Sequence, residues 1–459
     1  MITTAAKTTE LRAPARSLWT GKKSPFYDEW ESQPENLRRR IMGERLDEYV
    51  RYAVSTVPFY KQRLSAYRPH DEQPLRKVPP MNSQELRELL PPKSDLLIAD
   101  KDGGYNVFQS GGTTGLPKTT LFSHEELEGL ILPNARGFHA VGLVPQDRVA
   151  NLFAVGGLYM TFLHIHRMLQ QYGCTNFPFS NHTPADFIHT VTRLFKINCI
   201  AGIASVALGC LRGMAKLGLD GIEIEKVYYG GEHIYEADKK ELREKFGARI
   251  IAAPGYGTVD TWYIGYQCLE CATGVFHAHD DQCYIEIADS ETHETLPAGS
   301  SGMLYATPFP RRLTPIVRYQ VGDRAAWIGE PCPCGRTTPL FKLLGRGDDV
   351  LRIGFDSVDY AYVQEVVSRV AGLSGAVQME KKREEGRDRL ILRVETEAHE
   401  TRHKQLAQEL NQKLVQNRPS LRKFIAEGSV WPLQVELLRP DSLPRNPRTG
   451  KLLRVIDAI

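Results

Sequence analysis

The chain has 459 residues, which is longer than a single hydrophobic core usually supports, so two or more domains are expected. Hydrophobic residues make up 42% and charged residues 25%, a composition that excludes a disordered chain. The formal net charge of +3 is nearly balanced, so we expect neither a nucleic-acid partner nor a membrane partner.

No segment has the pattern of a targeting or membrane-spanning sequence. The first residues, MITTAAKTTELRAPARS, lack the apolar core of a signal peptide. The longest apolar stretch, INCIAGIASVALGCL, is too short and too interrupted to span a bilayer, and it predicts a buried strand followed by a buried helix. We therefore expect a cytoplasmic protein whose eight cysteines are thiols or metal ligands rather than disulfides.

The predicted elements change in character along the chain. The first hundred residues are helical and charged, as in ENLRRRIMGERLDEYVRYAVSTV, and are interrupted at Pro58 and at the PPMN and PPK segments. From about residue 104, short apolar strands alternate with helices; the strands are YNVFQS, KTTLFSH, RVANLFAV, INCIAGI, KVYYGGE and RIIAAPGYG. This alternation predicts a layered α/β fold.

Two further changes predict the domain organisation. Between residues 283 and 345 the strands follow one another closely, as in CYIEIAD, SGMLYAT and RAAWIG, which predicts a β-rich subregion. Beyond residue 345 come helices DYAYVQEVVSRVAG and TRHKQLAQELNQKLVQN and the strand LQVELLRP, together a compact α+β unit. We expect a large N-terminal α/β domain over residues 1–345 and a small mobile C-terminal α+β domain over residues 346–459.

The loop SGGTTGLPK at residues 110–118 is rich in glycine and hydroxyl side chains. Glycines let a backbone turn its N–H groups inward, and the hydroxyls add donors, so such a loop suits phosphate oxygens. A Walker-type loop is excluded because Lys118 does not follow the last glycine and the next residues, KTTLFS, favour a strand rather than a helix. The loop is predicted to connect a hairpin; a flexible surface loop is the alternative.

Motifs further along the chain favour a phosphate-binding loop over a flexible surface loop. SGGTTGLPK resembles the phosphate loop of the acyl-adenylate-forming superfamily, which includes acyl-CoA synthetases, luciferases and peptide-synthetase adenylation domains. Four more resemblances follow in the superfamily's order: YGGE with GYGTVD, IVRYQVGDRA, GRGDDVLRIG and PRNPRTGKLLR. Within the superfamily, YAVSTVPFYKQRL, VRYQVGD and PCPCGR resemble the phenylacetate–CoA ligase branch, which activates mostly aromatic acids.

The resemblance implies an ATP site. The predicted ATP-binding residues are Ser110, Gly111, Gly112, Thr113, Thr114, Gly115, Gly230, Gly231, Glu232, Tyr256, Gly257, Thr258, Asp323 and Arg346. Residues 110–115 with Lys118 would cradle the phosphates, Tyr256 would face adenine, and Asp323 would accept the ribose hydroxyls. Packing roles are the ordinary alternative for Tyr256 and Asp323.

The same resemblance implies the catalytic and hinge residues. Lys451 would bridge the substrate carboxylate and the α-phosphate, assisted by Lys118, because two anions must be brought together in this reaction. Asp348 would be the hinge of the small domain. Asp260 would hold Mg²⁺, although the superfamily usually has a hydroxyl residue and glutamate where this chain has Val259 and Asp260. Thr258 or Thr261 is a candidate for the missing donor.

A cysteine cluster follows the nucleotide segments. CLECATGVFH and PCPCGR bring cysteines and a histidine at spacings that suit a tetrahedral, structural Zn²⁺. We interpret Cys271, His277, Cys332 and Cys334 as the ligand set, as in zinc-containing members of the same branch. Cys268 in place of His277 is the alternative, and buried thiols without metal are another.

The sequence therefore predicts an ATP-dependent, AMP-forming ligase that adenylates a carboxylic acid, expected to be aromatic, and transfers it to coenzyme A. Transfer to a carrier protein or an amine, or a nucleotide-binding protein without catalysis, are the alternatives. ATP, Mg²⁺, coenzyme A and structural Zn²⁺ are the expected cofactors and substrates. The acid and the oligomeric state stay open, with a homodimer as one candidate.

Overall fold

The computed structural model describes residues 24–109, 118–231, 234, 236–346, 350–354, 356–373, 376–439, 442–443 and 455–457. Its N-terminal part is helical: η1 (Glu29–Ser32), α1 (Glu35–Thr56), α2 (Phe59–Arg63) and α3 (Ser83–Leu89). Asp28 caps η1 in a capping box, and the Asn82 side chain accepts from the backbone N–H of Glu85 at 2.8 Å to start α3. Long helix α1 ends at Thr56, before Pro58, as the sequence predicts.

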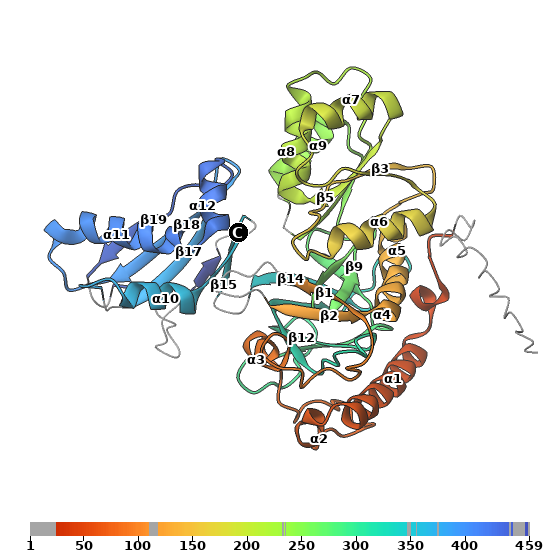
Figure 1. Ribbon diagram of the computed structural model, residues 1–459. Helices are drawn as coiled ribbons and strands as arrows, with labels where there is room; N and C mark the ends of the chain where they lie inside the picture. Colours follow the sequence, from red (N-terminus) through yellow and green to blue (C-terminus); the bar gives the residue numbers. More distant parts are fainter. Residues whose placement is uncertain are drawn as a thin grey trace, which may run out of the picture.

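A parallel sheet of five strands forms the next layer. Its spatial order is β4-β3-β5-β6-β7, and its strands are β3 (Arg148–Asn151), β4 (Thr175–Pro178), β5 (Cys199–Ile203), β6 (Lys226–Gly230) and β7 (Ile250–Ala252). Helices connect the strands, namely α6 (Thr161–Tyr172), α7 (Ala185–Phe195), α8 (Ala204–Ala215) and α9 (Glu236–Phe246). The predicted alternation of strands and helices, and the strand-then-helix pair β5–α8, are confirmed (Figure 1).

A hairpin precedes this sheet. Strands β1 (Tyr105–Gln109) and β2 (Thr119–Ser123) pair antiparallel, with Gln109 opposite Thr119, so residues 110–118 connect a hairpin as predicted. The capping box of Ser123 and Glu126 then starts α4 (His124–Gly129), and α5 (Ile131–Ala140) follows.

The β-rich subregion is a seven-stranded antiparallel sheet of order β11-β12-β13-β14-β10-β9-β8. Its strands are β8 (Tyr256–Thr258), β9 (Trp262–Tyr266), β10 (Val275–Ala278), β11 (Cys283–Ala288), β12 (Ser301–Pro308), β13 (Tyr319–Ile328) and β14 (Leu340–Arg346). The sheet therefore begins at Tyr256, before the predicted start at residue 283. Strands β8 to β10 were not predicted as part of this subregion because each is too short to show a clear alternating pattern of apolar and polar residues.

The C-terminal elements pack on a hydrophobic core of their own, which runs from Leu351 to Leu433. A mixed sheet of order β19-β18-β17-β20 and two further strands carry the helices, and this unit lies to one side of the rest (Figure 1). The elements are β15 (Val350–Ile353), β16 (Asp356–Asp359), α10 (Tyr360–Ser368), β17 (Val377–Glu384), β18 (Arg387–Glu395), η2 (Glu400–Arg402), α11 (His403–Gln416), α12 (Pro419–Ala426), β19 (Gln434–Leu438) and β20 (Val455–Asp457). The expected fold class, an α/β unit with a β-rich subregion followed by a small mixed unit, is confirmed.

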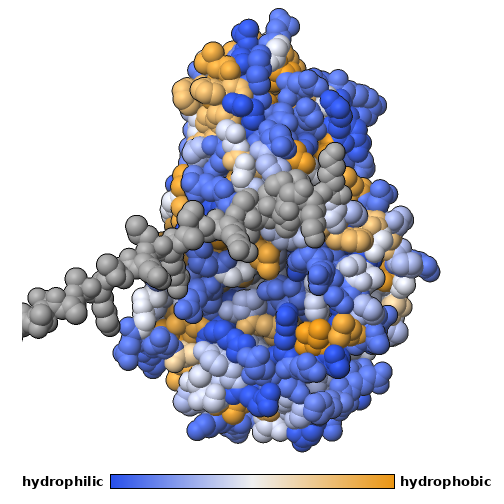
Figure 2. Space-filling model, turned by 90° about the vertical axis from the view of Figure 1, so that its right-hand side faces the viewer, coloured by the Kyte–Doolittle hydropathy of each residue, from blue (hydrophilic) through white to orange (hydrophobic). Residues whose placement is uncertain are grey.

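The visible surface is mainly hydrophilic. Figure 2 shows a face on which hydrophilic residues predominate and hydrophobic residues lie in small groups. Among the described residues, no helix combines the length and the apolar character that crossing a membrane requires.

Candidate active site

Lys118 is the first described residue after the loop at 110–117, and its side chain is almost fully buried. Its ammonium forms an ion pair with Oδ2 of Asp260, from the turn between β8 and β9, and donates a hydrogen bond to the Tyr319 hydroxyl at 2.7 Å. The Tyr319 hydroxyl in turn donates to Oδ2 of Asp260 at 3.2 Å. These three residues, the Lys–Asp–Tyr cluster, join segments that are about 60 to 200 residues apart in the chain.

Burial and charge set the protonation of this cluster. Burial by itself lowers the pKa of Lys118, but the Asp260 carboxylate and Tyr319 outweigh burial and raise the pKa above its ordinary value. Burial raises the pKa of Tyr319, and the Asp260 carboxylate raises it further. Lys118 is therefore a cation and Tyr319 a neutral hydroxyl at neutral pH. The cluster places a positive charge at the end of the predicted phosphate loop.

The turn that carries Asp260 is held by threonine hydroxyls. The Thr258 hydroxyl lies 3.0 Å from the Thr261 hydroxyl and accepts from the backbone N–H of Asp260 at 3.3 Å. Gly257 is required here, because a Cβ atom at that position would lie 1.8 Å from the Trp262 carbonyl oxygen. Val259 packs against the apolar cluster around Trp262. The two threonine hydroxyls thus hold this turn in place, and Val259 has a packing role.

Asp260 suits a hard cation. The residue is fully buried, and its Oδ1 atom has no hydrogen-bond partner among the described residues. A buried carboxylate oxygen without a partner is costly in an apolar setting and is the kind of ligand that Mg²⁺ takes. The donor chemistry therefore fits the ion, and the role of Asp260 as magnesium ligand stays a prediction.

A second contact ties the predicted adenine and ribose residues together. The Tyr256 hydroxyl donates to Oδ2 of Asp323 at 2.6 Å. The Tyr256 ring packs at a tilt on Phe276 and Phe341, with ring centroids 5.4 and 5.8 Å apart. In the β-sheet, Asp323 is paired with Arg346. Tyr256 and Asp323 are thus in direct contact, and their roles at adenine and ribose stay predictions.

The glycines at the end of β6 complete the described part of the nucleotide segments. Gly230 ends β6, and Gly231 has φ 74°, a conformation that favours glycine. The carboxyl ends of parallel strands are where open α/β folds bind ligands. The predicted residues that lie outside the described residues are Ser110, Gly111, Gly112, Thr113, Thr114, Gly115, Glu232, Asp348, Lys451 and the side chain of Arg346.

The cysteine-rich segments form a compact cluster. The ligand atoms of Cys268, His277, Cys332 and Cys334 all lie within 4.8 Å of one another. Sulfur atoms of Cys268 and Cys332 are 3.6 Å apart, and Sγ of Cys334 is 3.4 Å from Nε2 of His277. Two sulfurs on one tetrahedral zinc ion lie about 3.8 Å apart, given Zn–S bonds of about 2.3 Å. The spacing therefore fits zinc.

The group differs from the predicted set at one position. It contains Cys268 where the sequence interpretation has Cys271, whose sulfur lies 3.5 Å from that of Cys268. Cys268 is buried next to β9, whereas Cys271 is half-buried one turn further along. Nδ1 of His277 lies 3.0 Å from the Thr338 hydroxyl, which leaves Nε2 to face the sulfurs, as in many zinc sites.

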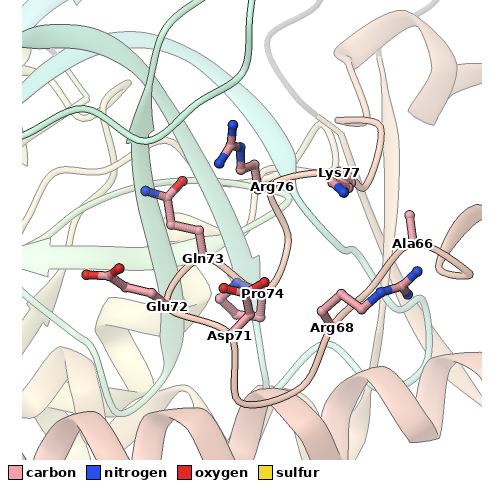
Figure 3. Close-up of a pocket in the computed structure, with 8 residues that line it drawn as sticks. All are labelled: Ala66, Arg68, Asp71, Glu72, Gln73, Pro74, Arg76 and Lys77. Atoms are coloured by element: carbon pink, nitrogen blue, oxygen red, sulfur yellow. The ribbon is translucent and has the colours of Figure 1, made fainter.

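A hollow on the loop at 66–77 is not part of this site. Figure 3 shows the polar side chains that border it, among them Arg68, Asp71, Glu72 and Arg76. It contains none of the predicted site residues.

One residue of the Lys–Asp–Tyr cluster, Tyr319, was not predicted from the sequence, although it stands four positions before Asp323 in the segment RYQVGD.

The described site thus joins the parallel sheet, the β-rich sheet and several residues that the sequence predicts to bind ATP. Residues 47–307, more than half of the chain, match the family of AMP-binding enzymes, and the protein belongs to this family of adenylate-forming enzymes.

Two curated relatives and one solved structure are similar over nearly the whole chain. A phenylacetate-coenzyme A ligase of Thermus thermophilus is 27% identical over 450 residues, covering 94% of this chain and 99% of the relative. A phenylacetate-coenzyme A ligase of Aromatoleum evansii is 25% identical over 436 residues, covering 93% and 96%. The structure of 2-hydroxyisobutyryl-CoA ligase with 2-HIB-AMP and CoA has a TM-score of 0.72 at 22% identity, covering 95% of this chain and 92% of that one.

Proposed function

We propose that this protein is an ATP-dependent, AMP-forming ligase that adenylates an aromatic carboxylic acid and transfers the acyl group to coenzyme A. One observation carries the proposal: Lys118, Asp260 and Tyr319 meet in one buried cluster. These residues come from three of the segments that resemble adenylate-forming enzymes. The similarity to phenylacetate-coenzyme A ligases over nearly their full length supports the aromatic acid and the coenzyme A acceptor.

The chemistry assigns a task to each group. Two anions, the acid carboxylate and the α-phosphate, must approach each other while pyrophosphate leaves. Lys118 and the loop at 110–115 would hold the departing phosphates, and Asp260 would hold Mg²⁺, whose charge offsets theirs. Tyr256 and Asp323 would position the adenosine. Lys451 would stand between the two reacting anions, where a fixed positive charge is most effective.

We further propose the division at residues 345 and 346, with Asp348 as the pivot of the small unit. The separate core from Leu351 to Leu433 supports this division. Arg383 of β17 forms an ion pair with Asp238 of α9 at 3.3 Å, across the two units. Polar contacts of this kind are common between domains that move relative to each other.

Acid-dependent exchange between pyrophosphate and ATP tests the proposal, over a panel of aryl and alkyl acids. Exchange with aryl acids supports it, and exchange with alkyl acids alone would contradict the aromatic assignment. Products made with coenzyme A, an acyl carrier protein or lysine as acceptor then identify the second step. A nucleotide-binding protein without catalysis would bind ATP and show no exchange with any acid.

A further inference from the structure

The backbone around Tyr319 is held by hydrogen bonds to the segment that contains Met81. The backbone of Met81 pairs with both of its neighbours: Met81 N–H donates to the Arg318 carbonyl at 2.9 Å, and Gln320 N–H donates to the Met81 carbonyl at 2.8 Å. Arg318 is fully buried and donates to the carbonyls of Arg76 and Val78 at 2.8 and 2.7 Å. The start of β13 is therefore anchored to the segment at residues 76–81.

This anchoring fixes the hydroxyl of Tyr319 at the one oxygen of Asp260 that already has a partner. Oδ2 of Asp260 receives both the Lys118 ammonium and the Tyr319 hydroxyl, whereas Oδ1 has no partner among the described residues. The two charges of the cluster offset each other. Burial makes this pairing important, because an uncompensated charge in the interior is strongly destabilising.

Nucleotide binding changes the demands on these groups. If Lys118 turns toward phosphate oxygens, Oδ2 of Asp260 loses its ammonium, and a buried carboxylate needs another donor on that side. Tyr319 is a neutral donor that cannot follow the phosphates, since its backbone is fixed. It is the group that remains on Oδ2 when Lys118 leaves.

We propose that Tyr319 is a positioning residue for nucleotide binding: its hydroxyl keeps hold of Oδ2 of Asp260 when Lys118 moves to the phosphates, so that Oδ1 stays available to Mg²⁺. This inference rests on the proposed function. It concerns metal-dependent ATP affinity rather than the chemical step.

The test is the variant Tyr319→Phe, which keeps the ring and removes only the hydroxyl. ATP is titrated by calorimetry without acid, at a series of Mg²⁺ concentrations. In the variant, Oδ2 of Asp260 lacks the hydroxyl that would remain when Lys118 leaves, so Lys118 parts from Asp260 less readily. The Kd for ATP at saturating Mg²⁺ should rise about tenfold, the scale of one hydrogen bond to a charged group. The half-saturating Mg²⁺ concentration should rise as well.

A matched control separates this role from general loosening of the fold. The Tyr60 hydroxyl is fully buried and donates to the Pro315 carbonyl at 2.7 Å, away from the Lys–Asp–Tyr cluster. Tyr60→Phe should lower the melting temperature about as much as Tyr319→Phe and leave both ATP constants unchanged. In an Asp260→Asn background, Tyr319→Phe should have less than about a twofold further effect, because residues that act through one group are not additive.

The outcomes decide the inference. Wild-type ATP affinity and Mg²⁺ dependence in Tyr319→Phe would overturn it, and so would an equal shift in Tyr60→Phe or a full effect in the Asp260→Asn background. If the wild-type protein itself binds no ATP in the presence of Mg²⁺, the proposed function fails together with it.

Discussion

Replacing Cys268 or Cys271 by serine distinguishes the zinc set in the structure from the set predicted from sequence. The structure groups Cys268 with His277, Cys332 and Cys334. We expect about one zinc ion per chain in the wild-type protein and in Cys271→Ser, and a large loss of zinc in Cys268→Ser. The reason is that serine is a poor ligand for zinc, and of these two cysteines only Cys268 contributes a sulfur to the group.

The size of the effect on stability follows from the closed geometry of the cluster. Structural zinc sites in small peptides bind with about 10–16 kcal/mol, and that free energy is folding free energy. Removing one of four ligands is expected to cost about a quarter of the lower figure, roughly 3 kcal/mol. At about 2 °C per kcal/mol for a large unit, this corresponds to a fall in Tm of about 6 °C. Cys268→Ser should show this fall, and Cys271→Ser should stay within about 2 °C of wild type.

Metal analysis of protein prepared without chelator, together with thermal unfolding of the three proteins, provides the assay. Adding a chelator to the wild-type protein should lower its Tm toward that of Cys268→Ser. Zinc retained in Cys268→Ser and lost in Cys271→Ser would show that Cys271, as predicted from the sequence, and not Cys268 is the ligand. Absence of zinc from all three proteins would refute the site altogether.

Three other predictions concern the nucleotide site and its surroundings. Lys451→Ala should reduce pyrophosphate exchange by about 10²-fold or more while ATP binding measured by calorimetry survives, and full activity would contradict its assignment. Asp260→Asn should raise the Mg²⁺ concentration needed for half-maximal exchange, whereas Asp260→Glu should retain activity; the same Mg²⁺ dependence in wild type and both variants would remove Asp260 as the ligand. Burial lowers the pKa of His164 to about 3 in the folded protein. The unfolded chain therefore takes up this proton first, and stability falls as the pH drops below about 6.5. Between pH 7 and pH 5 the free energy of unfolding should drop by about 2 kcal/mol through this residue, so Tm should fall less in His164→Leu than in wild type. An equal fall in both proteins would contradict the lowered pKa of His164.

Local patterns predicted most of the elements. Apolar runs such as INCIAGI and KVYYGGE became β5 and β6, and the helical segment TRHKQLAQELNQKLVQN became α11. These elements are recognisable because one strand or helix face carries its own periodic signal. The hairpin around residues 110–118 was predictable for the same reason, since β-prone residues stand on both sides of a glycine-rich loop.

Contacts between distant segments were not predictable in this way. Tyr319 joins Lys118 and Asp260, and nothing in the spacing of these residues indicates that their side chains meet. The choice between Cys268 and Cys271 has the same origin. Both cysteines of CLEC have plausible spacing, and the end of β9 decides which thiol points to the others. Tertiary packing, rather than local pattern, selects the site residues here.

Buried ion pairs in the same region were equally unpredictable from local sequence. Arg136 is almost fully buried between Asp28 and Asp281, at 2.7 and 2.8 Å, and Arg336 pairs with buried Glu31. In sequence, each of these residues is indistinguishable from a solvated surface charge. Their pairing fastens the N-terminal segment to the β-rich sheet, and it becomes visible only when all partners are in place.

The central claim is that this protein activates a carboxylic acid by forming its adenylate. The most direct measurement is the nucleotide product made from ATP with Mg²⁺, coenzyme A and an aryl acid such as phenylacetate or another acid from the panel, resolved by chromatography. We expect AMP, formed only when an acid is present and in amounts equal to the acyl thioester. ADP as the product, or AMP formed at the same rate without any acid, would contradict it.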